Sequence, residues 1–285
     1  MNRERFKVSL SSPLSRVLKF FSFCFFGNRC IACRSLISVF SDIGFCDKCE
    51  KSVKVFDDKR FSNEEGELML ATAPYFSAWR KSLIHFKFHG AREAGEYHAK
   101  RIAENIMSYT DISEYDGILC VPAIVSLERK RRYNQAEVLA RNVADFLDLP
   151  FCDYMEKKKD IKSQTTCKNS AERFKNVRGA YGLNEEGIKN VSGKSFILID
   201  DITTTGATLS ECGKALRAGG VRNILYATAA KTVIGGDFLP LRLPIENGKG
   251  DIVFLKKRWK KPENFEKAAR RRLNKTLLQS RFLRK

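Results

Sequence analysis

Residues 196–209 constrain the fold more than any other part of the sequence. Phe196 to Ile199 is a short apolar run, typical of a buried strand, and two adjacent acids, Asp200 and Asp201, follow it directly. Six of the next seven residues are Thr, Gly or Ala, and a helical pattern begins at about Leu209. A buried strand, a loop of small residues and a helix in this order predict one turn of an α/β sheet.

The composition of this loop suits an anion. Small residues let the backbone approach closely, consecutive amides form a nest, and the helix start adds its free N–H groups. Two carboxylates beside a phosphate need another task, and accepting hydrogen bonds from vicinal ribose hydroxyls, with Mg²⁺ nearby, is such a task. The alternative is a plain turn in which Asp200 and Thr204 cap the helix. The candidate binding residues are Asp200, Asp201, Thr203, Thr204, Thr205, Gly206, Ala207 and Thr208.

The region around this loop alternates strand-like and helical segments. Residues 116–121 are an apolar strand that ends at a proline, and residues 134–147 have helical spacing. Further strands are expected at 151–155 and 223–230, with a long loop over 158–176 between them. The sequence therefore predicts an α/β domain over residues 68–235 with a doubly wound, mostly parallel sheet, whose ligand lies at the carboxyl ends of the strands.

Four of the nine cysteines form two close pairs near the N-terminus, Cys30-x2-Cys33 and Cys46-x2-Cys49. Two such pairs can supply four thiolates to a tetrahedral Zn²⁺ ion. Disulfides conflict with the reducing compartment that an odd cysteine count suggests, and a redox motif explains one pair only. We therefore expect a closed, structural zinc site in a small zinc-ribbon-like module. Packing and nucleic-acid contact are equally good roles for this module.

The remaining zones lie at the two ends. Residues 1–55 are expected to hold a leader helix and the zinc module, and residues 236–285 a connector and a basic tail. Residues 256–285 contain 13 Lys and Arg but two acids, which is +11 of the net charge of +19. Such a tail favours nucleic acid, and single-stranded DNA is one such partner. The alternatives are a solubilising tail or a basic surface helix.

The apolar run at residues 17–27 follows basic residues, as in a signal peptide, but it contains Lys19 and has no small-x-small cleavage pattern. It is also far shorter than the roughly 20 apolar residues that a membrane-spanning helix needs. We therefore expect a cytoplasmic protein that is not an integral membrane protein.

The loop also carries a resemblance to a known family. The stretch DDITTTGAT, residues 200–208, resembles the phosphoribosyl pyrophosphate signature of type I phosphoribosyltransferases. The resemblance implies that Asp200 and Asp201 bind the ribose hydroxyls and act in catalysis. It further implies that residues 203–208 cradle the 5-phosphate, and that Mg²⁺ accompanies the ligand.

Other blocks resemble the ComF branch, which is associated with bacterial competence for DNA uptake. They are KFHG (87–90), VPAI (121–124) followed by RKRRYNQAEVLA (129–140), and KSQT (162–165) followed by ERFKNVRGAY (172–181). The resemblance implies a pyrophosphate-side loop and a flexible lid. The pyrophosphate-side candidates are Val121, Pro122, Arg129, Lys130, Arg132 and Asn134, and the lid candidates are Lys162, Gln164 and Arg173. A solvated basic helix start remains the alternative for 129–132.

Three functions are compatible with these features. The first is a ComF-like protein that binds phosphoribosyl pyrophosphate and acts with the competence machinery in DNA uptake. The second is an active phosphoribosyltransferase of nucleotide metabolism whose base or amine acceptor the sequence does not name. The third is a regulator that senses phosphoribosyl pyrophosphate without consuming it. Fold analogy alone does not decide between them.

Overall fold

The structure is a computed structural model, and most of the central region of the chain is described in it. The described residues are 28–38, 44–56, 58–62, 67–89, 92–123, 133–159, 161 and 169–232. The predicted leader helix and the predicted connector and basic tail, 236–285, lie outside these residues.

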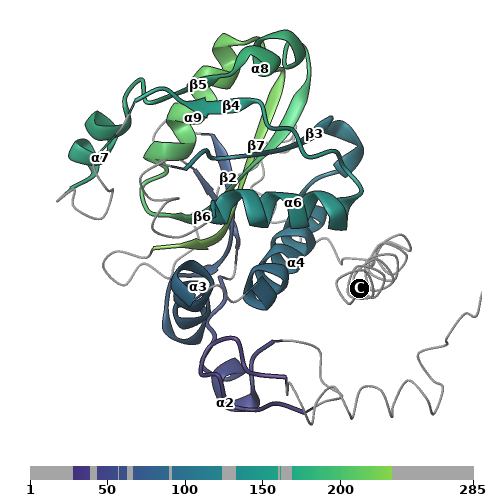
Figure 1. Cartoon of the computed structure of the whole chain (residues 1–285), viewed down its shortest axis with the longest axis vertical. Coiled ribbons are helices and arrows are strands. Elements are labelled where there is room, and N and C mark those ends of the chain that lie inside the picture. Colours follow the sequence, from purple (N-terminus) through teal and green to yellow (C-terminus); the bar gives the residue numbers. More distant parts are fainter. Residues whose placement is uncertain are drawn as a thin grey trace, which may run out of the picture.

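A five-stranded sheet forms the centre of the molecule (Figure 1). Its strands, in spatial order, are β1 (Arg60–Ser62), β2 (Leu68–Pro74), β7 (Asn223–Lys231), β6 (Ser195–Thr203) and β3 (Gly117–Cys120). Strands β2, β7, β6 and β3 are parallel, and β1 pairs antiparallel at the edge. The prediction of a mostly parallel α/β sheet is therefore confirmed.

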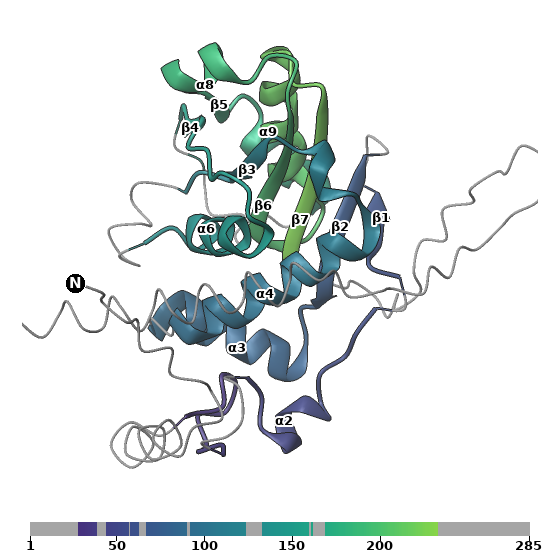
Figure 2. The same cartoon turned by 90° about the vertical axis from the view of Figure 1, so that its right-hand side faces the viewer.

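Helices cover both faces of the sheet (Figures 1 and 2). Helices α4 and α6 pack together on one face, whereas α9 returns the chain in the opposite direction along the sheet and covers the other face. The helices are α2 (Asp47–Glu50), α3 (Ser77–His89), α4 (Arg92–Tyr109), the 3-10 turn η1 (Ile112–Glu114), α6 (Gln135–Leu147), α7 (Ser170–Val177), α8 (Glu185–Asn190) and α9 (Ala207–Ala218). In the described part of the chain, no helix is long and apolar enough to cross a bilayer.

Helix α6 shows how local sequence sets an element. The side chain of Asn134 accepts a hydrogen bond from the N–H of Ala136 and so caps the helix start. Apolar residues at helical spacing bury one face against the sheet, and Asp148 ends the helix in the left-handed conformation. The helix expected over 134–147 is confirmed.

Two short strands lie outside the main sheet, β4 (Met155–Lys157) and β5 (Tyr181–Leu183), paired antiparallel. The N–H of Lys158 donates to the carbonyl of Ala180 over 2.8 Å, so the ends of the intervening segment are held together. The strand expected over 151–155 begins only at Met155, because Phe151 makes an isolated bridge to Ile118 and the chain then leaves the main sheet.

The long loop expected over 158–176 is interrupted by helix α7. The side chain of Asn169 accepts a hydrogen bond from the N–H of Glu172 over 2.8 Å and caps this helix. The expectation of a continuous loop was therefore wrong for residues 170–176, which belong to this helix. The helix is short and amphipathic, so the hydrophobic pattern alone did not reveal it. Its capping residue was the local signal for a helix start.

The cysteine-containing segment packs on helix α3, which lies between α2 and the sheet in both views (Figures 1 and 2). Ala78 of α3 is buried in a small cluster with Cys30, Ala32 and Ile37. The ring centroid of Phe45 lies 5.9 Å from that of Trp79, which is also on α3. Helix α3 therefore joins this segment to the main core.

Candidate functional site

The end of strand β6 places the acidic pair and the small-residue loop together. Asp200 and Asp201 lie near the carboxyl end of β6, and the chain then turns into α9. Gly206 caps this helix with φ 81°, a left-handed conformation that residues with a Cβ rarely adopt. Helix α9 begins at Ala207, two residues earlier than expected, so its first N–H groups face the loop.

The loop is held from the end of the neighbouring strand β7. The N–H of Thr232 donates to the carbonyl of Thr203 over 2.8 Å, and the hydroxyls of Thr204 and Thr232 lie 3.3 Å apart. The ammonium of Lys231 donates to the carbonyl of Thr204 over 3.0 Å, and burial lowers the pKa of this lysine. The backbone path of the loop is therefore fixed by hydrogen bonds on the β7 side.

The remaining loop threonines lie at the helix start. The hydroxyl of Thr205 accepts from the N–H of Ala207 over 3.4 Å, and the hydroxyl of Thr208 is hydrogen-bonded to Tyr181 of β5. Burial is the main cause that raises the pKa of Tyr181, so its phenol is neutral at pH 7. The start of α9 thus carries the neutral hydroxyls of Thr205 and Thr208.

The two carboxylates differ in their surroundings. The side chain of Asp200 accepts the N–H of Asp201 over 2.8 Å. Burial, followed by the negative charge of Asp201, raises the pKa of Asp200 to about 7, although part of the residue remains exposed. The Asp201 carboxylate forms an ion pair with Lys87, with 2.6 Å between Oδ2 and Nζ.

Lys87 is a site residue whose role the sequence did not indicate, as are Tyr181, Lys231 and Thr232 around the loop. It lies in the last turn of α3, within the KFHG block that was singled out only for its resemblance. The available signal was weak: a lysine in the KFHG block, directly after the apolar residue Phe86, which the structure buries.

Three of the predicted pyrophosphate-side residues lie beside β6. The N–H of Val121 donates to the carbonyl of Ile199 over 3.0 Å, and Pro122 follows. The amide Nδ2 of Asn134 donates to the carbonyl of Val121 over 3.2 Å, while its oxygen caps α6. Asn134 thus ties the start of α6 to the end of β3. Arg129, Lys130 and Arg132 lie outside the described residues.

Of the predicted lid residues, Arg173 is on α7, which packs against α9. Lys162 and Gln164 lie outside the described residues. After α7, the N–H of Gly179 donates to the carboxylate of Glu211 on α9 over 2.6 Å. The chain that follows α7 is therefore attached to α9, the helix that begins at the small-residue loop.

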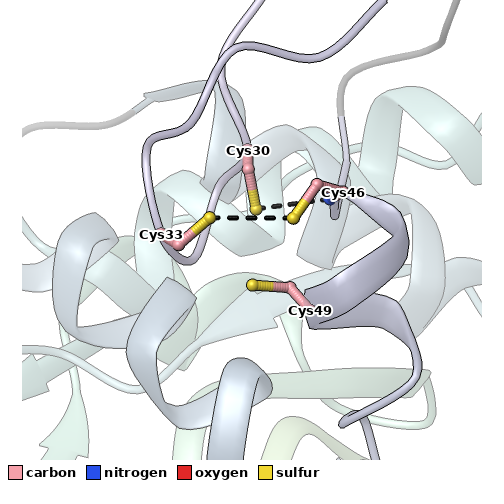
Figure 3. Close-up of side chains that lie close together, drawn as sticks. All are labelled: Cys30, Cys33, Cys46 and Cys49. Carbon is pink, nitrogen blue, oxygen red and sulfur yellow. Dashed lines mark hydrogen bonds between the residues drawn. The ribbon is translucent and has the colours of Figure 1, made fainter.

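The four cysteines of the two pairs converge in space, as Figure 3 shows. Cys30 and Cys33 come from one turn, and Cys46 and Cys49 come from the start of α2. All four sulfurs lie within 4.8 Å of one another, and those of Cys33 and Cys46 are 3.7 Å apart. A tetrahedral site with Zn–S bonds of about 2.3 Å requires sulfurs about 3.8 Å apart, so the four thiols fit such a metal.

The surroundings of this cysteine cluster also favour a metal. The N–H of Cys46 donates to the sulfur of Cys30 over 3.3 Å. Hydrogen bonds from Ser35 lower the pKa of Cys33 to about 6, and the backbone of Cys49 lowers that of Cys46. Burial raises the pKa of Cys49. The two lowered pKa values favour the thiolate, the form that binds metals.

A comparison with known protein families matches residues 94–235 to the phosphoribosyl transferase domain. The matched stretch contains β3, β6, the small-residue loop, α9 and β7. The fold is therefore that of the type I phosphoribosyltransferases, as the loop sequence predicted. Helix α3 and the cysteine cluster precede the matched stretch.

Two curated relatives cover more of the chain. Competence protein F of Haemophilus influenzae is 26% identical over 70% of this chain and 95% of its own length. Competence protein ComFC of Streptococcus pneumoniae is 28% identical over 67% of this chain and 84% of its own. A solved allosteric regulatory enzyme of purine biosynthesis is 18% identical over 48% of this chain and 26% of its own, with a TM-score of 0.34. The chain thus carries a phosphoribosyl transferase domain and is similar to the ComF/ComFC competence proteins, as its motifs indicate.

Proposed function

We propose that this protein binds phosphoribosyl pyrophosphate at the end of β6 and acts in natural competence, in the uptake of DNA. The observation that supports the proposal most directly is the arrangement of Asp200, Asp201 and the loop 203–208 on one strand–turn–helix unit. The two relatives named as competence proteins support the role in competence.

Each part of the unit has a task toward this ligand. The carboxylates of Asp200 and Asp201 accept hydrogen bonds from the 2- and 3-hydroxyls of the ribose. The hydroxyls of the loop and the first N–H groups of α9 bind the 5-phosphate. Val121 and Pro122 lie on the pyrophosphate side, and the amide of Asn134 joins the start of α6 to Val121. Mg²⁺ arrives with the ligand, because Mg²⁺ is commonly bound by substrate phosphates and a few carboxylates.

The cysteine cluster holds Zn²⁺ in a structural role. Four cysteine ligands leave no open position for a substrate or water, which is typical of structural sites. The free energy of metal binding then contributes to folding of a segment that has few buried residues of its own. The site supplies no step of the chemistry at β6.

An active phosphoribosyltransferase of nucleotide metabolism, with an unidentified base or amine as acceptor, is the second candidate. The favouring observation is that both members of the acidic pair are intact and that Asp200, with a pKa of about 7, can hold or release a proton near neutral pH. Release of pyrophosphate in the presence of an acceptor separates this candidate from a protein that binds the ligand without turnover.

The proposal is tested by calorimetric titration of the purified protein with phosphoribosyl pyrophosphate and Mg²⁺. The Asp200→Asn/Asp201→Asn double variant is titrated beside it, with circular dichroism as the check of folding. We expect saturable heat in the wild type and none in the double variant. Absence of binding in the wild type would overturn the ligand assignment and leave the competence role to rest on the relatives alone.

A further inference from the structure

Lys87 and Asp201 form an ion pair that is largely withdrawn from water. Nζ of Lys87 lies 2.6 Å from Oδ2 of Asp201, and the two side chains are 16% and 14% exposed. Removing two charges from water is costly, and the cost is offset only where the pair has close, well-formed contact. This pair therefore differs from the exposed ion pairs of the helix surfaces, which contribute little.

The part of helix α3 that precedes Lys87 is held by hydrogen bonds at two points. The indole N–H of Trp79, two turns earlier in α3, donates to the carbonyl of Ala229 on β7 over 3.0 Å. The carbonyl of Phe86, the residue before Lys87, accepts a hydrogen bond from the hydroxyl of Tyr133. Because Lys87 extends from an anchored helix, the ion pair does not have to offset the conformational entropy of ordering a mobile loop.

The charge of Lys87 also reaches the neighbouring acid. The positive charge of Lys87 lowers the pKa of Asp200, against the raising effects of burial and of Asp201. Among the described residues, the other titratable groups that interact with Asp200 come from three elements: Cys120 of β3, Tyr181 of β5 and Cys212 of α9. Burial raises the pKa of each of them, so they are neutral at pH 7.

We propose that Lys87 is a positioning residue of the ribose site, whose ammonium holds the Asp201 carboxylate in place and offsets one of two adjacent negative charges. This inference rests on the proposed function and deepens it. A sugar phosphate carries several negative charges, and two uncompensated carboxylates would repel it. With Lys87 in place, the acidic pair can face such a ligand while the Asp201 carboxylate keeps one orientation.

The first test uses the protein without any ligand. Carbon-13 NMR of aspartate-labelled protein follows the titration of the Asp200 carboxyl in the wild type, Lys87→Met and Lys87→Arg, with Asp200→Asn for assignment. We expect Lys87→Met to move the titration to higher pH and Lys87→Arg to leave it near the wild-type position. Superimposed curves for the wild type and Lys87→Met would overturn the proposal.

The second test is calorimetric titration of the same proteins with phosphoribosyl pyrophosphate and Mg²⁺. We expect at least tenfold weaker binding by Lys87→Met, with most of the loss recovered in Lys87→Arg. Weaker binding without a shifted Asp200 titration would show a merely structural role and would overturn the proposal. So would unchanged binding by Lys87→Met.

Two outcomes, unfolding of Lys87→Met and absence of ligand binding by the wild type, call for further measurements. Should Lys87→Met unfold at the working temperature, Lys87→Gln takes its place, because its amide still donates to Asp201 but carries no charge. Should the wild type not bind phosphoribosyl pyrophosphate at all, the proposed function fails. The NMR titration of the ligand-free protein then decides the role of Lys87 toward the acidic pair by itself.

Discussion

Trp79 donates its indole N–H to the backbone carbonyl of Ala229 over 3.0 Å and so fixes helix α3 to strand β7. The same indole lies against Phe45, the residue directly before Cys46. One side chain therefore contacts both the cysteine segment and the central sheet. Loss of order in the cysteine segment is expected to reach the sheet through this residue.

This contact leads to a prediction for metal removal. We expect one zinc ion per chain by mass spectrometry of metals, and its loss in Cys49→Ser. A loss of about 3 kcal/mol in stability would lower the melting midpoint by roughly 6–12 °C. In a Trp259→Phe background, the emission of Trp79 should change on metal removal. Cys152→Ser is the matched control, because Cys152 lies outside the cluster; equal metal content in both cysteine variants would contradict the prediction.

A second prediction follows from the raised pKa of Asp200. Its folded-state pKa of about 7 lies above the ordinary value of 3.8, so the folded chain keeps a proton that the unfolded chain loses. Stability therefore falls as pH rises from about 4 to about 7. Asp200→Asn should be more stable than the wild type at pH 8, by at most about 4 kcal/mol, with a smaller gain near pH 4.

Urea denaturation at a series of pH values measures this difference. The exposed Asp153→Asn serves as the control and should show no comparable dependence on pH. A gain for Asp200→Asn that is the same at every pH would show that the effect does not come from ionisation. The same variant should lose phosphoribosyl pyrophosphate binding. Asp200 would then lower the stability of the fold at neutral pH while being required to bind the ligand.

Gly206 offers a third prediction because of its backbone conformation. Gly206 has φ 81° and Gly193 has φ 73°, so alanine is strained at both positions. A methyl group at Gly193 meets no neighbouring atom within 4 Å, and this glycine lies in the turn before β6, at the opposite end of that strand. Each substitution should lower stability by about 1 kcal/mol. Only Gly206→Ala should also weaken ligand binding. Equal binding by both variants would show that the left-handed conformation at Gly206 is not needed to bind the ligand.

The basic segment 256–285 gives a fourth prediction that concerns nucleic acid. Each phosphate of single-stranded DNA contacted by a cation steepens the dependence of log affinity on log salt by about 0.7. Deletion of residues 256–285 should weaken binding to single-stranded DNA and flatten the salt dependence. Replacing Arg270, Arg271 and Arg272 with glutamine should produce part of the effect. Unchanged affinity after the deletion would exclude this segment as the binding element.

The sequence predicted the elements whose signals are local. The apolar run before Asp200 and the helix over 134–147 are found where the hydrophobic pattern places them. Strand β6 is nevertheless longer than the apolar run, because its pairing with β7 continues to Thr203. Helix α9 starts early because Gly206 adopts a conformation that composition suggests but does not establish.

What the sequence did not predict depends on contacts between distant segments. The role of Lys87 arises because α3 ends beside β6, more than a hundred residues away in the sequence. The antiparallel pairing of β4 and β5 joins strands separated by a segment without clear periodicity. Such pairings are set by tertiary packing, which a single sequence does not display.

The hydrogen bond between Lys158 and Ala180 joins the two ends of the segment between β4 and β5, so this segment starts and returns at one point of the molecule. For a flexible loop whose ends already meet, doubling its length costs only about 0.6 kcal/mol of closure entropy. A change in the number of residues in this segment therefore costs little closure entropy. We expect that insertions and deletions between β4 and β5 would change what reaches the end of β6 and leave the sheet unchanged.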